Sequence, residues 1–149
     1  MKKKQIIRFL ALCLTAVFIL PMSAKAAAPE SVAPLASNQL DTYSANVVAR
    51  GSGKLSVSFT IYGVGVMDAV GCQRIRLYES LDGANWYFVA EFTPTSYSNM
   101  MAYGARELIS SVPYSGVAGR YYKAFVTVTA TNSSGTDTRS FWTAVVRAT

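Results

Sequence analysis

Residues able to do chemistry are scarce in this sequence, and the acids near position 80 form the strongest group. Glu79 begins the stretch ESLDGANW at the end of one strand-like segment, Asp82 lies inside the stretch, and Glu91 lies in the next strand-like segment. Two carboxylates about 5–10 Å apart can hydrolyse a glycosidic bond. No neighbouring residue would raise the pKa of one acid above that of the other, so solvated acids at a strand edge are the favoured interpretation.

Other forms of catalysis lack their usual residues. The sequence contains no histidine, which removes the commonest general base and metal ligand. Cys72 is the single cysteine after the N-terminal segment, so a thiolate zinc site and an internal disulfide are excluded. Asp82 is at best a weak calcium ligand, because acids do not recur at alternate positions around it. We therefore expect no catalytic residue, no metal and no cofactor, and we interpret Cys72 as a small buried apolar residue.

The first 26 residues have the pattern of a secretory signal peptide. Basic residues precede an apolar run over 9–20, and Ala24-Lys25-Ala26 fits a cleavage site. Twelve apolar residues are fewer than the roughly 20 that span a membrane. We predict a secreted, extracellular protein, cleaved near Ala26 and left without a stable membrane anchor. Lipid attachment at Cys13 is a disfavoured alternative, because Leu12 stands where a small residue is needed.

The net charge of +6 belongs mainly to this segment. Of the fourteen basic residues, five lie within 1–26, which leaves nine against eight acidic residues in the rest of the chain. A nearly neutral domain lacks the basic patch that nucleic-acid binding requires, so we expect no nucleic-acid partner.

The remaining 123 residues indicate a linker followed by one β domain. The stretch 27–39 is rich in Ala, Pro and Ser and is predicted to be a linker. The domain over 40–149 alternates apolar and polar residues, which predicts strands at 42–50, 54–62, 74–80, 86–92, 106–112, 121–132 and 138–146. About seven short strands and no helical pattern predict an all-β, antiparallel β-sandwich.

Aromatic side chains are the main candidates for binding. Trp86, Phe88 and Phe59 fall on core-type positions of their strands and are predicted to be buried. Tyr78, Tyr87, Tyr121 and Phe125 fall on the opposite phase. If that face is exposed, the three tyrosines form an aromatic binding stripe; if another layer covers it, they belong to the core. The loop Leu81–Asn85 is predicted to join the two strands as a hairpin, since Asp, Gly and Asn favour turns.

Three stretches carry a resemblance to known families. The segment GRYYKAFVTVTATNSSGT, 119–136, resembles the last hairpin of fibronectin type III and related immunoglobulin-like domains. That resemblance implies that the Tyr122 hydroxyl bonds to the backbone near the preceding corner. Together with GKLSVSFTIYGVGVMDAVG and IRLYESLDGANW, it makes the chain similar to small secreted proteins of gut Firmicutes that are catalogued as a domain of unknown function. This second resemblance implies export and one small β domain, and it assigns no functional residues.

The leading interpretation is therefore a secreted, non-enzymatic protein with a single immunoglobulin-like or fibronectin type III-like sandwich. We expect it to act as a binding module for a glycan, a cell-wall polymer or an extracellular protein. One alternative is a small secreted hydrolase, for which Glu79, Glu91 and Asp82 would converge in one pocket. Another is a self-assembling structural protein that pairs through an exposed edge strand at 138–146. The sequence leaves the ligand and the oligomeric state open.

Overall fold

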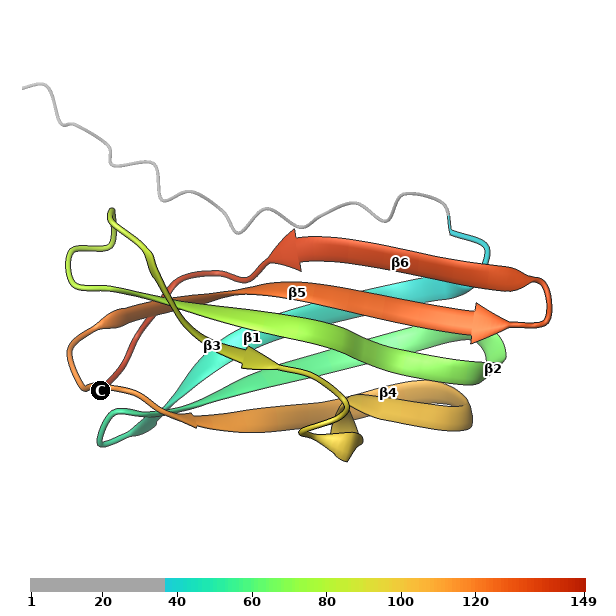
Figure 1. Cartoon of the computed structure of the whole chain (residues 1–149), viewed down its shortest axis with the longest axis horizontal. Helices are drawn as coiled ribbons and strands as arrows, with labels where there is room; N and C mark the ends of the chain where they lie inside the picture. Colours follow the sequence, from blue (N-terminus) through green and yellow to red (C-terminus); the bar gives the residue numbers. More distant parts are fainter. Residues whose placement is uncertain (1–36) are drawn as a thin grey trace, which may run out of the picture. The chain divides into compact units, whose positions relative to one another are not determined.

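The computed structural model of the protein describes residues 37–149, which form antiparallel strands and one short 3-10 helix (Figure 1). The elements are β1 (Leu40–Gly51), β2 (Lys54–Ser80), β3 (Tyr87–Phe92), η1 (Ser98–Met100), β4 (Met101–Ser115), β5 (Tyr121–Asn132), β6 (Gly135–Trp142) and β7 (Val146–Arg147). The predicted signal peptide at 1–26 and most of the predicted linker at 27–39 lie outside the described residues.

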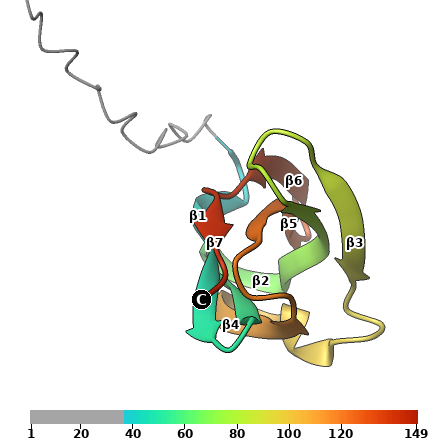
Figure 2. The same cartoon turned by 90° about the vertical axis from the view of Figure 1, so that its left-hand side faces the viewer.

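The long strand β2 organises the sheet. One edge of β2 pairs first with β1 and then with β5, and the other edge pairs first with β4 and then with β3. β6 and β7 both pair with β5, so the seven strands form one hydrogen-bonded sheet. Seen end-on in Figure 2, this sheet curls into a half-barrel. The prediction of an all-β, antiparallel fold of about seven strands is confirmed.

The prediction that β2 would be two strands, 54–62 and 74–80, is wrong. The strand continues past residue 62 through Gly63 and Gly65, without a break before 74. The register against β4 shifts between Tyr62 and Met67, where several β2 residues lie opposite Arg106 alone. Such an irregularity bends a strand without ending it, and glycine permits the bend because it has no Cβ.

The core fills the inner face of the half-barrel. Alternate residues of β2 and β5 point into it and are almost fully buried: Leu55, Val57, Phe59, Ile61, Ile75, Leu77, Tyr122, Val126 and Val128. The predicted burial of Phe59 and Cys72 is confirmed. Burial raises the pKa of the Cys72 thiol to about 12. Met100 is also fully buried, as expected of a residue that fills an irregular gap in the core.

The other predicted strands are confirmed with changed ends. β5 matches 121–132, β1 extends the predicted 42–50 at both ends, and β4 is longer than the predicted 106–112. The last prediction, 138–146, divides into β6 and β7, because the chain leaves β6 after Trp142 and returns to pair with Tyr121 and Tyr122.

β3 contains a bulge that corrects one core assignment. Leu77 of β2 lies opposite Ala90, but the next residue, Tyr78, lies opposite Phe88, which leaves Val89 without a partner. One extra residue reverses the alternation of side chains between the two faces. Phe88 is consequently 56% exposed and Trp86 only half-buried, although both were predicted to lie in the core.

The segment before β1 is hydrogen-bonded to β6. The Asp137 carboxylate of β6 accepts a hydrogen bond from the Ser37 hydroxyl and one of 2.7 Å from the Gln39 backbone N–H. These bonds lower the pKa of Asp137. The last three residues of the predicted linker, 37–39, therefore pack against the domain.

Candidate functional site

A cluster of aromatic rings lies on the outer face of the sheet, opposite the core. The Tyr78 ring centroid lies 5.9 Å from that of Phe88 and 5.2 Å from that of Trp142, and Phe125 lies 4.9 Å from Trp142. The rings are tilted or edge-on to one another, as aromatic pairs prefer. We call Tyr78, Phe88, Phe125, Trp142 and the adjacent Trp86 the outer aromatic face.

Strand register brings these side chains together. Tyr78 on β2 lies opposite Phe88 on β3 and Lys123 on β5, and Phe125 on β5 lies opposite Trp142 on β6. Residues directly opposite each other on paired strands point to the same face. Four strands thus contribute to the outer aromatic face, and the bulge at Val89 is the reason that Phe88 joins it.

Charged groups border the rings. The Lys123 ammonium lies over two indoles, 4.2 Å from the Trp86 ring centroid and 4.6 Å from that of Trp142. Such cation–π contacts hold the lysine and both indoles in place. Arg76 and Glu91 form an ion pair of 2.8 Å, and together with Tyr78 and Phe88 they line an open hollow of about 250 Å³. The surface therefore combines apolar ring faces with oriented hydrogen-bonding groups.

The three predicted stripe residues do not gather at one place. Tyr78 lies at the centre of the outer aromatic face. Tyr121 shares a face with Lys123, two residues along β5, and its ring contacts the Arg147 guanidinium at 5.7 Å. Tyr87 lies opposite Glu79 and therefore points to the other face, where it is 66% exposed.

Phe88, Trp142 and Lys123 are not among the site residues predicted from the sequence. Alternation along β6, where Thr138, Ser140 and Trp142 share a face, could have placed Trp142 beside Phe125. Phe88 could not have been found this way, because the alternation of Trp86, Phe88, Ala90 and Phe92 hides the bulge.

The acids singled out from the sequence lie in separate sets of contacts. Glu91 pairs with Arg76 on the outer face, whereas Glu79 pairs with Arg120 and Tyr122 on the other face. Asp82 bonds within its own loop. The hydrolase alternative requires two carboxylates that face each other across one site. Glu79 and Glu91 do not have this arrangement, because they lie on opposite faces of the sheet.

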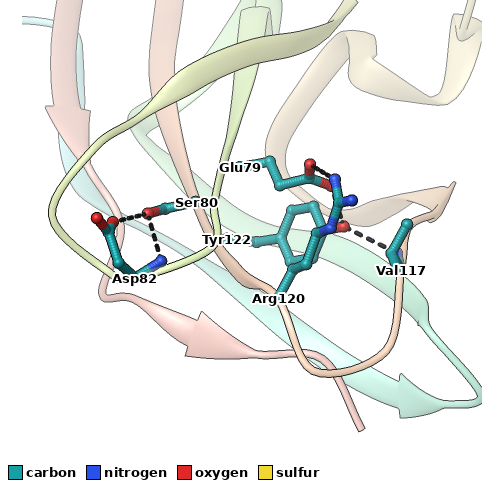
Figure 3. A network of polar contacts seen from close by, with 6 residues as sticks. All are labelled: Glu79, Ser80, Asp82, Val117, Arg120 and Tyr122. Atoms are coloured by element: carbon teal, nitrogen blue, oxygen red, sulfur yellow. Dashed lines mark hydrogen bonds and ion pairs between the residues drawn. The ribbon is translucent and has the colours of Figure 1, made fainter.

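The Tyr122 hydroxyl links three segments, as Figure 3 shows. It donates to the Glu79 carboxylate and accepts a hydrogen bond of 2.8 Å from the Val117 backbone N–H, while Arg120 also bonds to Glu79. The expected bond between Tyr122 and the preceding corner is confirmed. Burial, together with the bond to Glu79, raises the pKa of Tyr122 to about 12.

The loop between β2 and β3 is closed by its own side chains. The Asp82 carboxylate accepts hydrogen bonds from the backbone N–H groups of Ala84 and Asn85 at 2.9 and 2.8 Å, and the Ser80 hydroxyl donates to it (Figure 3). These donors lower the pKa of Asp82 well below its usual value. The predicted hairpin loop is confirmed, and its closure positions Trp86 at the edge of the outer aromatic face.

Self-assembly would require a free strand edge. Within residues 37–149, β6 pairs with β5 alone, so its second edge has no strand partner. Hydroxyl pairs join the outer faces of the two strands, with Thr127 Oγ1 and Ser140 Oγ 2.9 Å apart and Thr131 Oγ1 and Thr136 Oγ1 at the same distance. β6, which covers the first part of the predicted edge strand 138–146, is thus polar over most of its length and apolar near Phe141 and Trp142.

The part of the chain that the structure describes contains no group of three or more Cys, Asp or Glu side chains placed to hold a metal ion. Within residues 37–149, no helix is long and apolar enough to cross a bilayer. In comparisons with known proteins, no family model and no curated protein matches this sequence.

Proposed function

We propose that this protein is an exported, non-catalytic binding protein whose outer aromatic face binds a glycan or a cell-wall polysaccharide. The observation that carries the proposal is the exposure of large rings in one cluster: Phe88 is 56% and Trp142 49% exposed. Burying such rings is favourable, and contiguous exposed apolar surface on a soluble domain is typical of an interaction site.

The chemistry of the border favours a sugar polymer over a protein. The C–H faces of sugar rings are apolar and slightly positive, so they stack on the negative faces of aromatic rings. Sugar hydroxyls need donors and acceptors at fixed positions, which the Arg76–Glu91 pair and Lys123 supply. The centre of a protein–protein interface is depleted of Lys and Glu, whereas Lys123 and Glu91 lie beside the rings here.

Export and a finer fold assignment are part of the same proposal. The signal-peptide pattern at 1–26 supports delivery to the cell exterior, where wall polymers and glycans occur. The bond between Tyr122 and Val117 is typical of the tyrosine corner in immunoglobulin-like domains. We propose a distant relation of the half-barrel to the immunoglobulin-like and fibronectin type III-like sandwiches on this basis.

An array of glycans and cell-wall polymers tests the proposal. The purified protein is expected to bind at least one polymer, and Phe88→Ala with Trp142→Ala should weaken binding by about tenfold or more. Tyr87→Ala is the matched control, because this exposed ring is adjacent in sequence to Phe88 and points to the other face. Absence of binding to any polymer, or equal loss in the control, would contradict the proposal. Binding only to extracellular proteins would favour the protein-partner alternative.

A further inference from the structure

A second cavity lies away from the outer aromatic face, where the β1–β2 hairpin meets the end of β4. Its volume is about 550 Å³, and its polar lining includes Arg50, Lys54, Ser56, Ser111, Tyr97 and Tyr114. None of its lining residues belongs to the outer aromatic face. The cavity is therefore a separate candidate site that the proposed function does not use.

The lining is cationic and rich in hydroxyl groups. Arg50 and Lys54 both line the cavity, and no acidic side chain does. The Arg50 Nε donates 2.9 Å to the Ser56 hydroxyl, which orients the guanidinium. The ion pairs formed within residues 37–149 are Arg76–Glu91 and Arg120–Glu79, so neither cation of the cavity is neutralised there. Two cations without a counter-ion attract an oxyanion.

The turn that carries these cations is rigid. Its three residues Gly51, Ser52 and Gly53 all have positive φ, and Ser52 has a φ of 54°, which is uncommon for a residue with a side chain. The Gly53 N–H donates 2.8 Å to the Thr149 carbonyl, and the Gly53 carbonyl accepts 3.0 Å from the Gly116 N–H. Arg50 and Lys54 flank a turn held on both sides, so little backbone freedom is lost when a ligand binds.

We propose that this cavity binds an oxyanion carried on a hydroxylated ligand, namely a sugar acid or a sugar phosphate. Arg50 and Lys54 bind the carboxylate or phosphate, and Arg50 is suited to two parallel hydrogen bonds because its guanidinium is planar. The serine and tyrosine hydroxyls of the lining bind the ligand's hydroxyls. The buried Phe92 ring packs against the rings of Tyr97 and Tyr114, at centroid distances of 5.4 and 6.4 Å, and so restricts their positions.

NMR titration of the purified protein with glucuronate, glucose 6-phosphate and neutral glucose tests the proposal. At least one of the two anions is expected to shift the amide signals of Gly53 and Ser111 saturably, and glucose is not. The responding anion identifies the oxyanion. Binding should weaken as salt is added, because the cations are near the surface.

Variants locate the site. Arg50→Gln combined with Lys54→Gln should weaken anion binding by about tenfold or more. Arg106→Gln, which removes a cation of β4 outside this cavity, should leave binding unchanged. The single Lys54→Gln is available if the double variant fails to fold, since the Lys54 side chain is exposed. Equal shifts with glucose, unchanged affinity in the variants, or shifts confined to Phe88 and Trp142 would each overturn the proposal. The last result would leave the proposed function of the outer aromatic face intact.

Discussion

Single polar side chains hold the loops at one end of the sheet, and Tyr122 is the most deeply buried of them. Its hydroxyl has two partners, Val117 and Glu79, and no exposed surface. Removing the hydroxyl by Tyr122→Phe leaves both partners without their bond, so the free energy of unfolding should fall by about 1–3 kcal/mol. Chemical denaturation measures this change, and Tyr103→Phe, at a residue 75% exposed on β4, should be neutral.

The loss of stability caused by Tyr122→Phe should depend on pH. Because the pKa of Tyr122 is raised to about 12 in the fold, compared with about 10 in an unfolded chain, its contribution is fully present below pH about 10. It is lost as the pH rises through about 12. The stability difference between wild type and Tyr122→Phe should therefore shrink between these values. A constant difference across that range would contradict the assigned hydrogen bonds.

Asp82 stabilises its loop as a carboxylate acceptor. Its pKa is lowered chiefly by the backbone N–H groups of Asn85 and Ala84. A lowered pKa contributes stability above the unfolded value of about 4, and this contribution is lost as the pH falls toward the folded value. Asp82→Ala should thus lower the melting temperature by a few degrees at pH 7 and by much less near pH 2. Asp68→Ala, which removes an exposed acid of β2, serves as the control.

At the scale of elements, the bulge in β3 places two phenylalanines of the same strand on opposite faces of the sheet. Phe92 lies on the inner face and is 4% exposed, whereas Phe88 lies on the outer face. Phe92→Ala should lower the free energy of unfolding by about 3–5 kcal/mol, as expected of a buried ring. Phe88→Ala should cost about 1 kcal/mol or less, since it removes one exposed aromatic contact. Equal costs, measured by urea denaturation, would refute the bulge.

The hairpin loop between β2 and β3 depends on one glycine. Gly83 has a φ of +75°, which a β-branched residue adopts only with strain. Gly83→Val should therefore lower the free energy of unfolding by about 1–3 kcal/mol, read from thermal melts. Gly65→Val provides the comparison, because an added Cβ there meets open space and its φ lies outside the positive range. A smaller effect at Gly83 than at Gly65 would show that the loop is assigned wrongly.

These elements also show how far the sequence alone could lead. β5 was predicted at its observed bounds, because its apolar residues alternate without interruption. The continuity of β2 was not predicted. Glycines such as Gly63 and Gly65 can either end a strand or bend it, and the outcome depends on neighbouring strands that the sequence does not reveal. Of the outer aromatic face, the sequence predicted Tyr78 as a binding residue and placed Phe125 on the same face. Phe88 and Trp86 join it because of the bulge at Val89, which local alternation does not reveal.

For the molecule as a whole, the single core thiol reports on unfolding. Cys72 is fully buried with a raised pKa, so almost no reactive thiolate is present at neutral pH. In a protein carrying Cys13→Ser, thiol reagents should label Cys72 slowly in buffer and rapidly in denaturant. The labelling rate in buffer should rise by the factor by which Phe92→Ala increases the population of unfolded molecules. Rapid labelling of the native protein would contradict a buried thiol.

The length of β2 has a consequence for the order in which the chain can acquire structure. Its neighbour β1 precedes it in sequence, but β4 and β5 follow it, and contacts such as Tyr122 with Glu79 join residues 43 positions apart. The second half of β2 has no β5 beside it until Asn132 has left the ribosome. Native pairing of β2 is therefore completed only after β5 has been synthesised, and closing such distant contacts makes folding slow. Until then the second half of β2 lacks its β5 partner and stays available to chaperones or to other chains.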